Sequence, residues 1–123
     1  MGNWTKKRLY NKDFDPKSHY GSDRGIYKIT AGKNISYPKK SGKTLYIGKS
    51  ANLGKRLEDH INNRSSKEAI QAYLRSNTRV YFSIKRVNKH QRHQAMETDE
   101  LQKHQKTYGM IPICNGRIEN KRR

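Results

Sequence analysis

The chemistry available to this chain lies in two phenols, three basic side chains, one carboxylate and one amide: Tyr27, Tyr46, Lys49, Arg56, His60, Glu97 and Asn115. Hydrolysis of a phosphodiester needs an activated water, positive charge at the transition state and help for the departing oxygen. Arginine supplies permanent positive charge, and a carboxylate offers oxygen ligands to a hard cation. These residue types indicate phosphodiester hydrolysis at a single metal ion, Mg²⁺ or Mn²⁺.

Two strands are predicted on either side of a basic loop in the first half of the chain. Residues 25–30 and 43–48 are rich in β-favouring side chains. The segment between them carries turn residues and lysines, which predicts a hairpin with a long basic tip. The sequence leaves open whether this tip follows a phosphate backbone or is a solvated loop. Apolar residues at 80, 82 and 84 alternate with polar ones and predict a third strand.

A helix is predicted to begin near Asn52, directly after the second strand. Its apolar residues recur every four positions from Leu53 to Ile61, which predicts one buried face. Arg56 and His60 are one helical turn apart at the margin of that face, so they lie side by side. The helix therefore offers two cationic or proton-handling groups at the edge of the core.

Two more helices are predicted in the second half of the chain. Ser65 to Glu68 has the pattern of a capping box and opens one of them. The last runs from about Lys89 to Tyr108, with Gly109 as its C-terminal stop. The order strand, strand, helix, helix, strand, helix (β-β-α-α-β-α) predicts a small α+β domain with a three-stranded, mostly antiparallel sheet flanked by helices.

The chain divides into one domain with two basic ends. Residues 1–24 are polar, basic and aperiodic, which predicts an extended arm or linker. Residues 25–115 hold all the predicted elements, and residues 116–123 form a basic tail. With 28 Lys and Arg against 10 Asp and Glu, the formal net charge is +18. Such a charge attracts polyanions, so nucleic acid is the expected partner, whether bound structurally or as a substrate.

Membrane association and secretion are not indicated. No apolar run approaches the ~20 residues that a membrane span requires, and the first residues lead into no apolar stretch of a signal peptide. Cys114 is the only cysteine, which excludes an internal disulfide and any multi-cysteine zinc site. Its apolar neighbours suggest a small buried hydrophobe. A reducing compartment and a cytoplasmic site of action are therefore expected.

Two other motifs are incomplete. The Gly-Lys-Thr at 42–44 and the Gly-Lys-Ser at 48–50 resemble the ends of phosphate-binding loops, but Tyr37 and Lys43 stand where the required upstream glycines would be. The pair His90 and His93 has no further Cys or His at zinc-site spacing, so solvated histidines are the simpler interpretation.

Read in order, the motifs resemble those of the GIY-YIG nuclease superfamily over roughly residues 25–115. The resemblance rests on Gly25-Ile26-Tyr27, Tyr46-Ile47-Gly48 and Lys49, on Asn52-Leu53, Arg56 and His60, and on Pro112-x-x-Asn115. Each tripeptide alone is common, and the combination is specific. The hairpin tip is longer than in compact members, and the link from the acid to Asn115 is extended.

The resemblance implies a role for each site residue. Tyr27 would be the general base for the attacking water, with His60 assisting proton movement or replacing it. Arg56 would hold the scissile phosphate, Tyr46 would position water or phosphate, and Lys49 with Arg56 would stabilise a phenolate. Either tyrosine could instead be a core residue.

The carboxylate and the amide are assigned by the same resemblance. Glu97 would be the metal ligand, because it follows small and apolar residues on the last helix; Glu100 fits the pattern loosely and remains an alternative. Asn115 would fix local backbone or support the site through its amide, or would only form a turn.

The resemblance implies a metal-dependent endonuclease that cuts DNA and leaves 5′-phosphate and 3′-hydroxyl ends. The chain has no separate recognition module, so weak or absent sequence specificity is expected, or targeting by parts elsewhere. A basic linker before a minimal nuclease would also suit the toxin domain of a larger secreted protein, with an acidic immunity or inhibitor protein as partner. The alternatives are a catalytically silent nucleic-acid-binding module and an RNA-cleaving nuclease.

Overall fold

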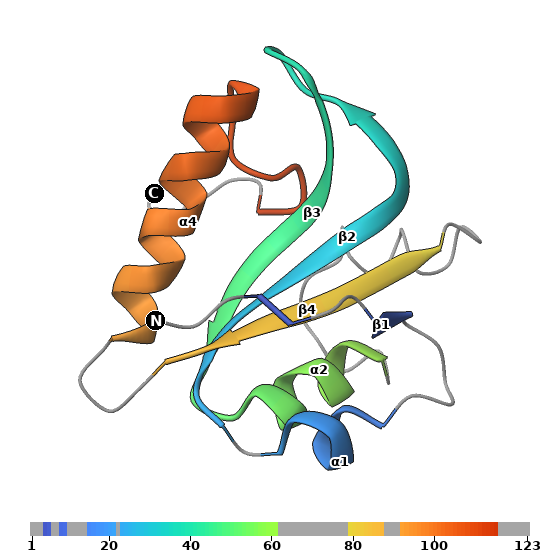
Figure 1. The fold of residues 1–123 in the computed structure, drawn as a ribbon, viewed down its shortest axis with the longest axis vertical. Coiled ribbons are helices and arrows are strands. Elements are labelled where there is room, and N and C mark those ends of the chain that lie inside the picture. The colour runs from blue at the N-terminus through green and yellow to red at the C-terminus, as the bar shows by residue number, and fades with distance from the viewer. Residues whose placement is uncertain are drawn as a thin grey trace, which may run out of the picture.

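The computed structural model describes residues 4–5, 8–9, 15–21, 23–61, 79–87 and 92–115. The helix predicted from Ser65, the residue His90 and the basic tail lie outside these ranges. In chain order the elements are β1 (Arg8–Leu9), α1 (Pro16–Tyr20), β2 (Gly25–Ser36), β3 (Ser41–Ser50), α2 (Leu53–Ile61), β4 (Val80–Arg86) and α4 (His93–Tyr108) (Figure 1). No helix within the described residues has the length and apolar character needed to cross a membrane.

An antiparallel sheet with the strand order β1-β4-β2-β3 forms the centre of the fold. The long strand β2 lies in the middle and pairs antiparallel with β3 on one side and with β4 on the other. This confirms the predicted α+β class and its three antiparallel strands. The short strand β1 adds a fourth at the β4 edge. The hairpin strands are longer than predicted, so the tip contracts to residues 37–40.

The two faces of the sheet have different chemistry. On one face Tyr27, Ile29 and Phe82 pack with the leucines of α2 in the hydrophobic core. Alternate residues of the strands point to the opposite face, and there Lys85 forms an ion pair with Glu100 of α4 at 3.0 Å. The helix α4 therefore lies on a mixed face, where Lys28 and Lys85 stand next to the buried Ile26 and Ile47, whereas α2 packs on the core face. This explains why α4 has so weak an apolar stripe in the sequence.

The described residues of the N-terminal segment contact the domain at both ends of that segment. The ring of Trp4 lies under the ammonium groups of Lys28 and Lys85, at 4.3 and 5.4 Å from its centroid. The backbone N–H of Thr5 donates to the carbonyl of Ile84 at 2.9 Å, and the Ile84 N–H donates back to the Thr5 hydroxyl at 3.0 Å. The aperiodic composition of residues 1–24 gave no indication of these contacts.

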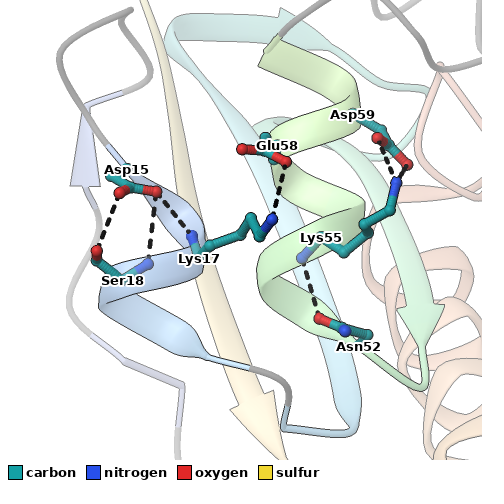
Figure 2. A network of polar contacts seen from close by, with 7 residues as sticks. All are labelled: Asp15, Lys17, Ser18, Asn52, Lys55, Glu58 and Asp59. Carbon is teal, nitrogen blue, oxygen red and sulfur yellow. Dashed lines mark hydrogen bonds and ion pairs between the residues drawn. The ribbon is translucent and has the colours of Figure 1, made fainter.

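The short helix α1 packs against α2, as Figure 2 shows from close by. Asp15 caps α1, because its carboxylate accepts hydrogen bonds from the backbone of Lys17 at 3.2 Å and of Ser18 at 3.4 Å. Lys17 then reaches Glu58 of α2 at 3.7 Å. Across α2, Lys55 pairs with Asp59 one turn away at 3.0 Å. The helix that carries Arg56 and His60 is thus supported on its outer side by α1.

The ends of the helices agree with the cap signals in the sequence. The side chain of Asn52 accepts a hydrogen bond from the Lys55 N–H at 3.1 Å, which starts α2 where it was predicted to start. Gly109 ends α4 in the left-handed conformation (φ 92°), and its N–H donates to Gln105 at 2.8 Å. The described part of α4 begins at His93, later than the predicted start near Lys89.

The C-terminal strap, residues 110–115, seals the outer edge of β3. The N–H of Cys114 donates to the carbonyl of Leu45 at 2.8 Å. The amide of Asn115 makes two hydrogen bonds to the backbone of Ile47, accepting from its N–H at 3.0 Å and donating to its carbonyl at 2.8 Å. Burial raises the pKa of the Cys114 thiol to about 11, so it stays protonated at neutral pH as a small core residue.

Replacing Asn115 by alanine tests the role of this strap in stability. Asn115→Ala removes both hydrogen bonds and leaves the Ile47 backbone groups without these partners, so we expect a loss of about 1–3 kcal/mol in the free energy of unfolding. Denaturant unfolding measures the loss. Asn34→Ala, at an exposed hairpin position, is the matched control and should change stability by less than ~0.5 kcal/mol. Equal effects of the two substitutions would contradict the structural role.

Candidate active site

A hydrogen-bonded cluster joins β2 to α2 inside the protein. The hydroxyl of Tyr27 lies 2.9 Å from Nε2 of His60, and Arg56 Nε donates to the same hydroxyl at 3.3 Å. The ring of Tyr46 on β3 lies beside both, with centroids 5.9 Å from Tyr27 and 6.2 Å from His60. Tyr27 and His60 are fully buried, Tyr46 is 6% exposed and Arg56 is half-buried.

Chemistry fixes one of the two hydrogen bonds of the Tyr27 hydroxyl. Arginine can only donate, so the Tyr27 oxygen accepts from Arg56. In the neutral tautomer of His60 that carries its proton on Nδ1, the Nε2 lone pair can accept the Tyr27 O–H. The arrangement gives the phenol a path along which its proton can leave.

Burial determines the acidity of both phenols. The pKa of Tyr27 is raised well above its usual range, chiefly because the side chain is desolvated and secondarily because of Tyr46, while the charge of Arg56 acts in the opposite direction. The pKa of Tyr46 is also raised by burial, with Arg56 opposing and the carboxylate of Glu97 adding to the rise. Neither phenol therefore ionises by itself near neutral pH.

The two candidate acids on α4 have different surroundings. Glu97 pairs with Lys49 at 3.7 Å and is close enough to influence Tyr46. Glu100 instead pairs with Lys85 at 3.0 Å and with Lys103 at 3.5 Å. Glu97 is thus the carboxylate of the two whose charge acts on Tyr46, whereas Glu100 pairs with Lys85 and Lys103.

The donor set around Glu97 fits a hard cation held mainly by water and substrate. Within the described residues, no three His, Cys, Asp or Glu side chains gather into a cluster that could hold a metal ion. Glu97 is 19% exposed, and its charge acts on Tyr46, so one carboxylate and one phenol are the oxygen donors to consider. Magnesium is typically bound by one or two carboxylates together with waters and phosphate oxygens. The residues present therefore fit Mg²⁺ or Mn²⁺, with Glu97 as the protein ligand.

Gly48 makes the close approach of the two phenols possible. A Cβ at this position would lie 2.5 Å from the Tyr27 ring and hydroxyl and 2.7 Å from the Tyr46 ring. These separations are far shorter than any ordinary contact, so only glycine fits beside the paired tyrosines. The glycine at the end of the Tyr-Ile-Gly motif is therefore needed because a larger residue would collide with both rings. The chemistry of the site residues alone does not predict this requirement.

The structure brings most of the predicted site residues together. Tyr27, Tyr46, Arg56 and His60 form the cluster, and the pair Lys49–Glu97 lies next to Tyr46. Asn115 is placed differently, because both ends of its amide are bonded to the Ile47 backbone at the β3 edge. It holds the middle residue of the Tyr-Ile-Gly motif.

With this geometry in view, the chain can be compared with known proteins. The family model of the GIY-YIG catalytic domain matches residues 23–109, which is most of the chain. No curated protein and no solved structure matches it significantly. The chain therefore belongs to the GIY-YIG catalytic domain family, and it is a nuclease domain. The elements β1 and α1 and the strap residues after Gly109 lie outside the matched segment.

The space at Gly48 can be tested by adding one methyl group. Gly48→Ala should push the Tyr27 ring away from His60, because the methyl would occupy the position of the ring. We expect a loss of about 1–3 kcal/mol in stability from overpacking and a fall of ~10² in cleavage rate from misplacement of the phenol. Thermal unfolding and a plasmid-cleavage assay measure the two effects. Wild-type values for both would show that the rings do not need this space.

Proposed function

We propose that this nuclease domain is a metal-dependent endonuclease that hydrolyses DNA and leaves 5′-phosphate and 3′-hydroxyl ends. The observation that carries the proposal is the buried Tyr27–His60 hydrogen bond with Arg56 on the same hydroxyl. A phenol connected to a proton acceptor on one side and to a permanent cation on the other suits proton removal next to a phosphate. The formal charge of +18 suits a polyanionic substrate.

The proton path follows from the acidity of Tyr27. Its raised pKa makes a free phenolate scarce at neutral pH, so the phenol is better suited to pass a proton on than to store negative charge. As water attacks phosphorus, one water proton passes to the Tyr27 oxygen while the Tyr27 proton passes to His60 Nε2. A phosphorus–oxygen bond forms to the water, the bond to the 3′ oxygen breaks, and that oxygen takes a proton from solvent.

The cationic residues stabilise the phosphate. Arg56 is the more exposed of the two groups that contact the Tyr27 hydroxyl, since His60 is fully buried. Binding of a phosphate by its guanidinium would draw Arg56 outward and give water access to that hydroxyl. Lys49, whose side chain is 40% exposed next to Glu97, is placed to add positive charge at the same phosphate.

Glu97 would hold the divalent cation, which supplies Lewis acidity at the scissile phosphate when bound. Its pairing with Lys49 at 3.7 Å orients the carboxylate before the cation arrives. The neighbouring Tyr46 would position water or phosphate by its hydroxyl. Mg²⁺ and Mn²⁺ share the preference for such oxygen ligands.

One experiment separates this function from its rivals. The protein is incubated with plasmid DNA and with structured RNA, each in Mg²⁺ and in EDTA. Cleavage of the plasmid at many positions in Mg²⁺ alone is the expected result. Cleavage of RNA alone, or binding without cleavage, would overturn the proposal. That the domain acts as a toxin with an acidic immunity partner remains a prediction of the sequence.

The proton relay predicts the behaviour of two single variants and their combination. Tyr27→Phe and His60→Ala should each lower the cleavage rate by about 10² to 10⁴, while costing about 1–2 kcal/mol in stability. Because both residues serve one proton path, the double variant should be little slower than either single variant. Single-turnover rates measure this. If the rate loss of the double variant equals the product of the two single losses, the two residues act separately.

The pH dependence of the wild-type rate distinguishes a relay from a free phenolate. Since the pKa of Tyr27 is raised, a rate carried by its phenolate would increase about tenfold per pH unit through pH 9. The relay passes the proton to His60 and forms no free phenolate, so its rate should not keep rising about tenfold per pH unit through pH 9. A rate still climbing tenfold per unit above pH 8 would contradict the relay.

The acids of α4 provide a matched pair for the metal ligand. Glu97→Ala should abolish cleavage and leave DNA binding unchanged or tighter, because it removes a metal ligand and a negative charge from a basic surface. Glu100→Ala, which breaks the contacts to Lys85 and Lys103, should retain cleavage within about tenfold. Parallel cleavage and binding assays measure both. If Glu100→Ala were inactive and Glu97→Ala active, the metal ligand would be Glu100, one turn further along α4.

A further inference from the structure

The β2–β3 hairpin carries lysines and no acidic residue, so all of its charge is positive. No Asp or Glu occurs between Asp23 and Glu58 in the sequence. The outer half of the hairpin within that segment carries four exposed lysines, Lys33, Lys39, Lys40 and Lys43. These residues are hereafter called the hairpin lysines.

Several other lysines and one arginine form ion pairs within the fold. Ion pairs connect lysines or an arginine to carboxylates at Lys17–Glu58, Lys49–Glu97, Lys55–Asp59, Lys85–Glu100, Arg86–Asp23 and Lys103–Asp99. None of the ion pairs found within the described residues involves a hairpin lysine. The hairpin therefore presents positive charge that these neighbouring carboxylates do not neutralise.

The hairpin tip is held in place by the end of α4. The N–H of Lys39 donates to the carbonyl of Tyr108 at 2.9 Å, and its ammonium donates to the carbonyl of Lys106 at 3.1 Å. A Cβ on Gly42 would lie 2.7 Å from the Tyr108 ring, so this ring packs directly on the β3 backbone. Lys40 lies over the same ring, 5.8 Å from its centroid.

The strap fixes the base of the tip from the other side. The Tyr37 hydroxyl donates to the carbonyl of Thr44 at 2.5 Å and accepts from the N–H of Ile113 at 3.0 Å. Because the tip is bound to α4 and to the strap before any ligand arrives, little ordering of its backbone would be needed on binding. This distinguishes it from a solvated loop.

The hairpin also sets the distance between its tip and the candidate active site. The strands β2 and β3 run from the candidate active site to the tip, with register shifts in their pairing between Ile29 and Ile35. Both strands curve on the way, as Figure 1 shows. Ser41 precedes Tyr46 by five residues, which spans at most about 17 Å of strand. Phosphates along one strand of DNA follow each other at about 3.4 Å of helix axis, so this distance corresponds to at most about five base pairs.

We infer that the hairpin lysines form a second DNA-contact surface, which binds backbone phosphates within about five base pairs of the scissile phosphate. The inference rests on the proposed function, because it takes DNA as the substrate. The hairpin and the active site together would bind one duplex along the length of β2 and β3. The tip would anchor the duplex, and the cluster around Tyr27 would cut it.

Two triple variants of equal charge test this inference. Lys33→Gln/Lys40→Gln/Lys43→Gln removes three hairpin charges and leaves Lys39, which bonds to α4, in place. Lys17→Gln/Lys55→Gln/Lys103→Gln removes three charges from ion-paired lysines elsewhere. Binding to a duplex of ~24 base pairs is measured in EDTA over a range of salt, so that the result does not depend on cleavage.

The hairpin triple should lower the slope of log affinity against log salt by about 2 to 3, since each lost phosphate contact contributes about 0.9. The control triple should change the slope by less than ~1. The arginine triple Lys33→Arg/Lys40→Arg/Lys43→Arg keeps the charge and should keep the wild-type slope on the long duplex.

Equal changes of slope in the hairpin and control triples would overturn the inference, and so would an unchanged slope in the hairpin triple. Unfolding temperatures confirm that the variants are folded before binding is compared. Cleavage in Mg²⁺ is measured separately. If the inference is right, the hairpin triple should raise KM at an unchanged kcat, whereas a wild type that binds DNA but does not cut it would contradict only the proposed function.

Discussion

The buried hydrogen bond between the Tyr27 hydroxyl and His60 Nε2 is the contact on which the rest of this site depends. It connects the central strand to the helix that follows the hairpin, so it fixes the helix against the sheet as well as the phenol against the imidazole. A buried polar group that lacks its hydrogen-bond partner destabilises the fold, because no water can take the place of that partner. The close approach also explains why Gly48 lacks a side chain, because the Tyr27 ring fills the space where one would be.

A phenol that transfers protons needs a fixed geometry and a phenolate that is not too costly to form. Burial helps the first requirement and opposes the second. It excludes water and so fixes the geometry, but it also makes the negative charge of a phenolate expensive. Arg56 offsets only part of that cost, because the pKa of Tyr27 is raised despite it. A neighbouring imidazole resolves the conflict, since the phenol can then pass a proton on without holding charge.

Much of this arrangement could be predicted from the sequence, because its signals are local. The alternation of Val80, Phe82 and Ile84 gave β4, and the four-residue repeat after Asn52 gave α2. The elements β1 and α1 were missed, since two- and five-residue elements carry too little periodicity to detect and are stabilised by contacts with distant residues.

The site shows the same division between local signals and tertiary contacts. Tyr27, Tyr46, Arg56 and His60 were predicted to lie together, and they do. The choice between Glu97 and Glu100 could not be made from spacing, because it depends on which lysine of the sheet each carboxylate meets. The position of Asn115 at the β3 edge likewise depends on how the chain returns after α4.

The strap along β3 has a consequence for how other polypeptides can approach this nuclease. An open strand edge invites a second chain to add its own strand, which is a common route both to complexes and to aggregation. Here Cys114 and Asn115 already occupy the backbone groups of Leu45 and Ile47, on either side of Tyr46 in β3. A protein that blocks the site by extending the sheet at this edge would first have to displace the strap. Recognition through side chains on the basic surface carries no such cost.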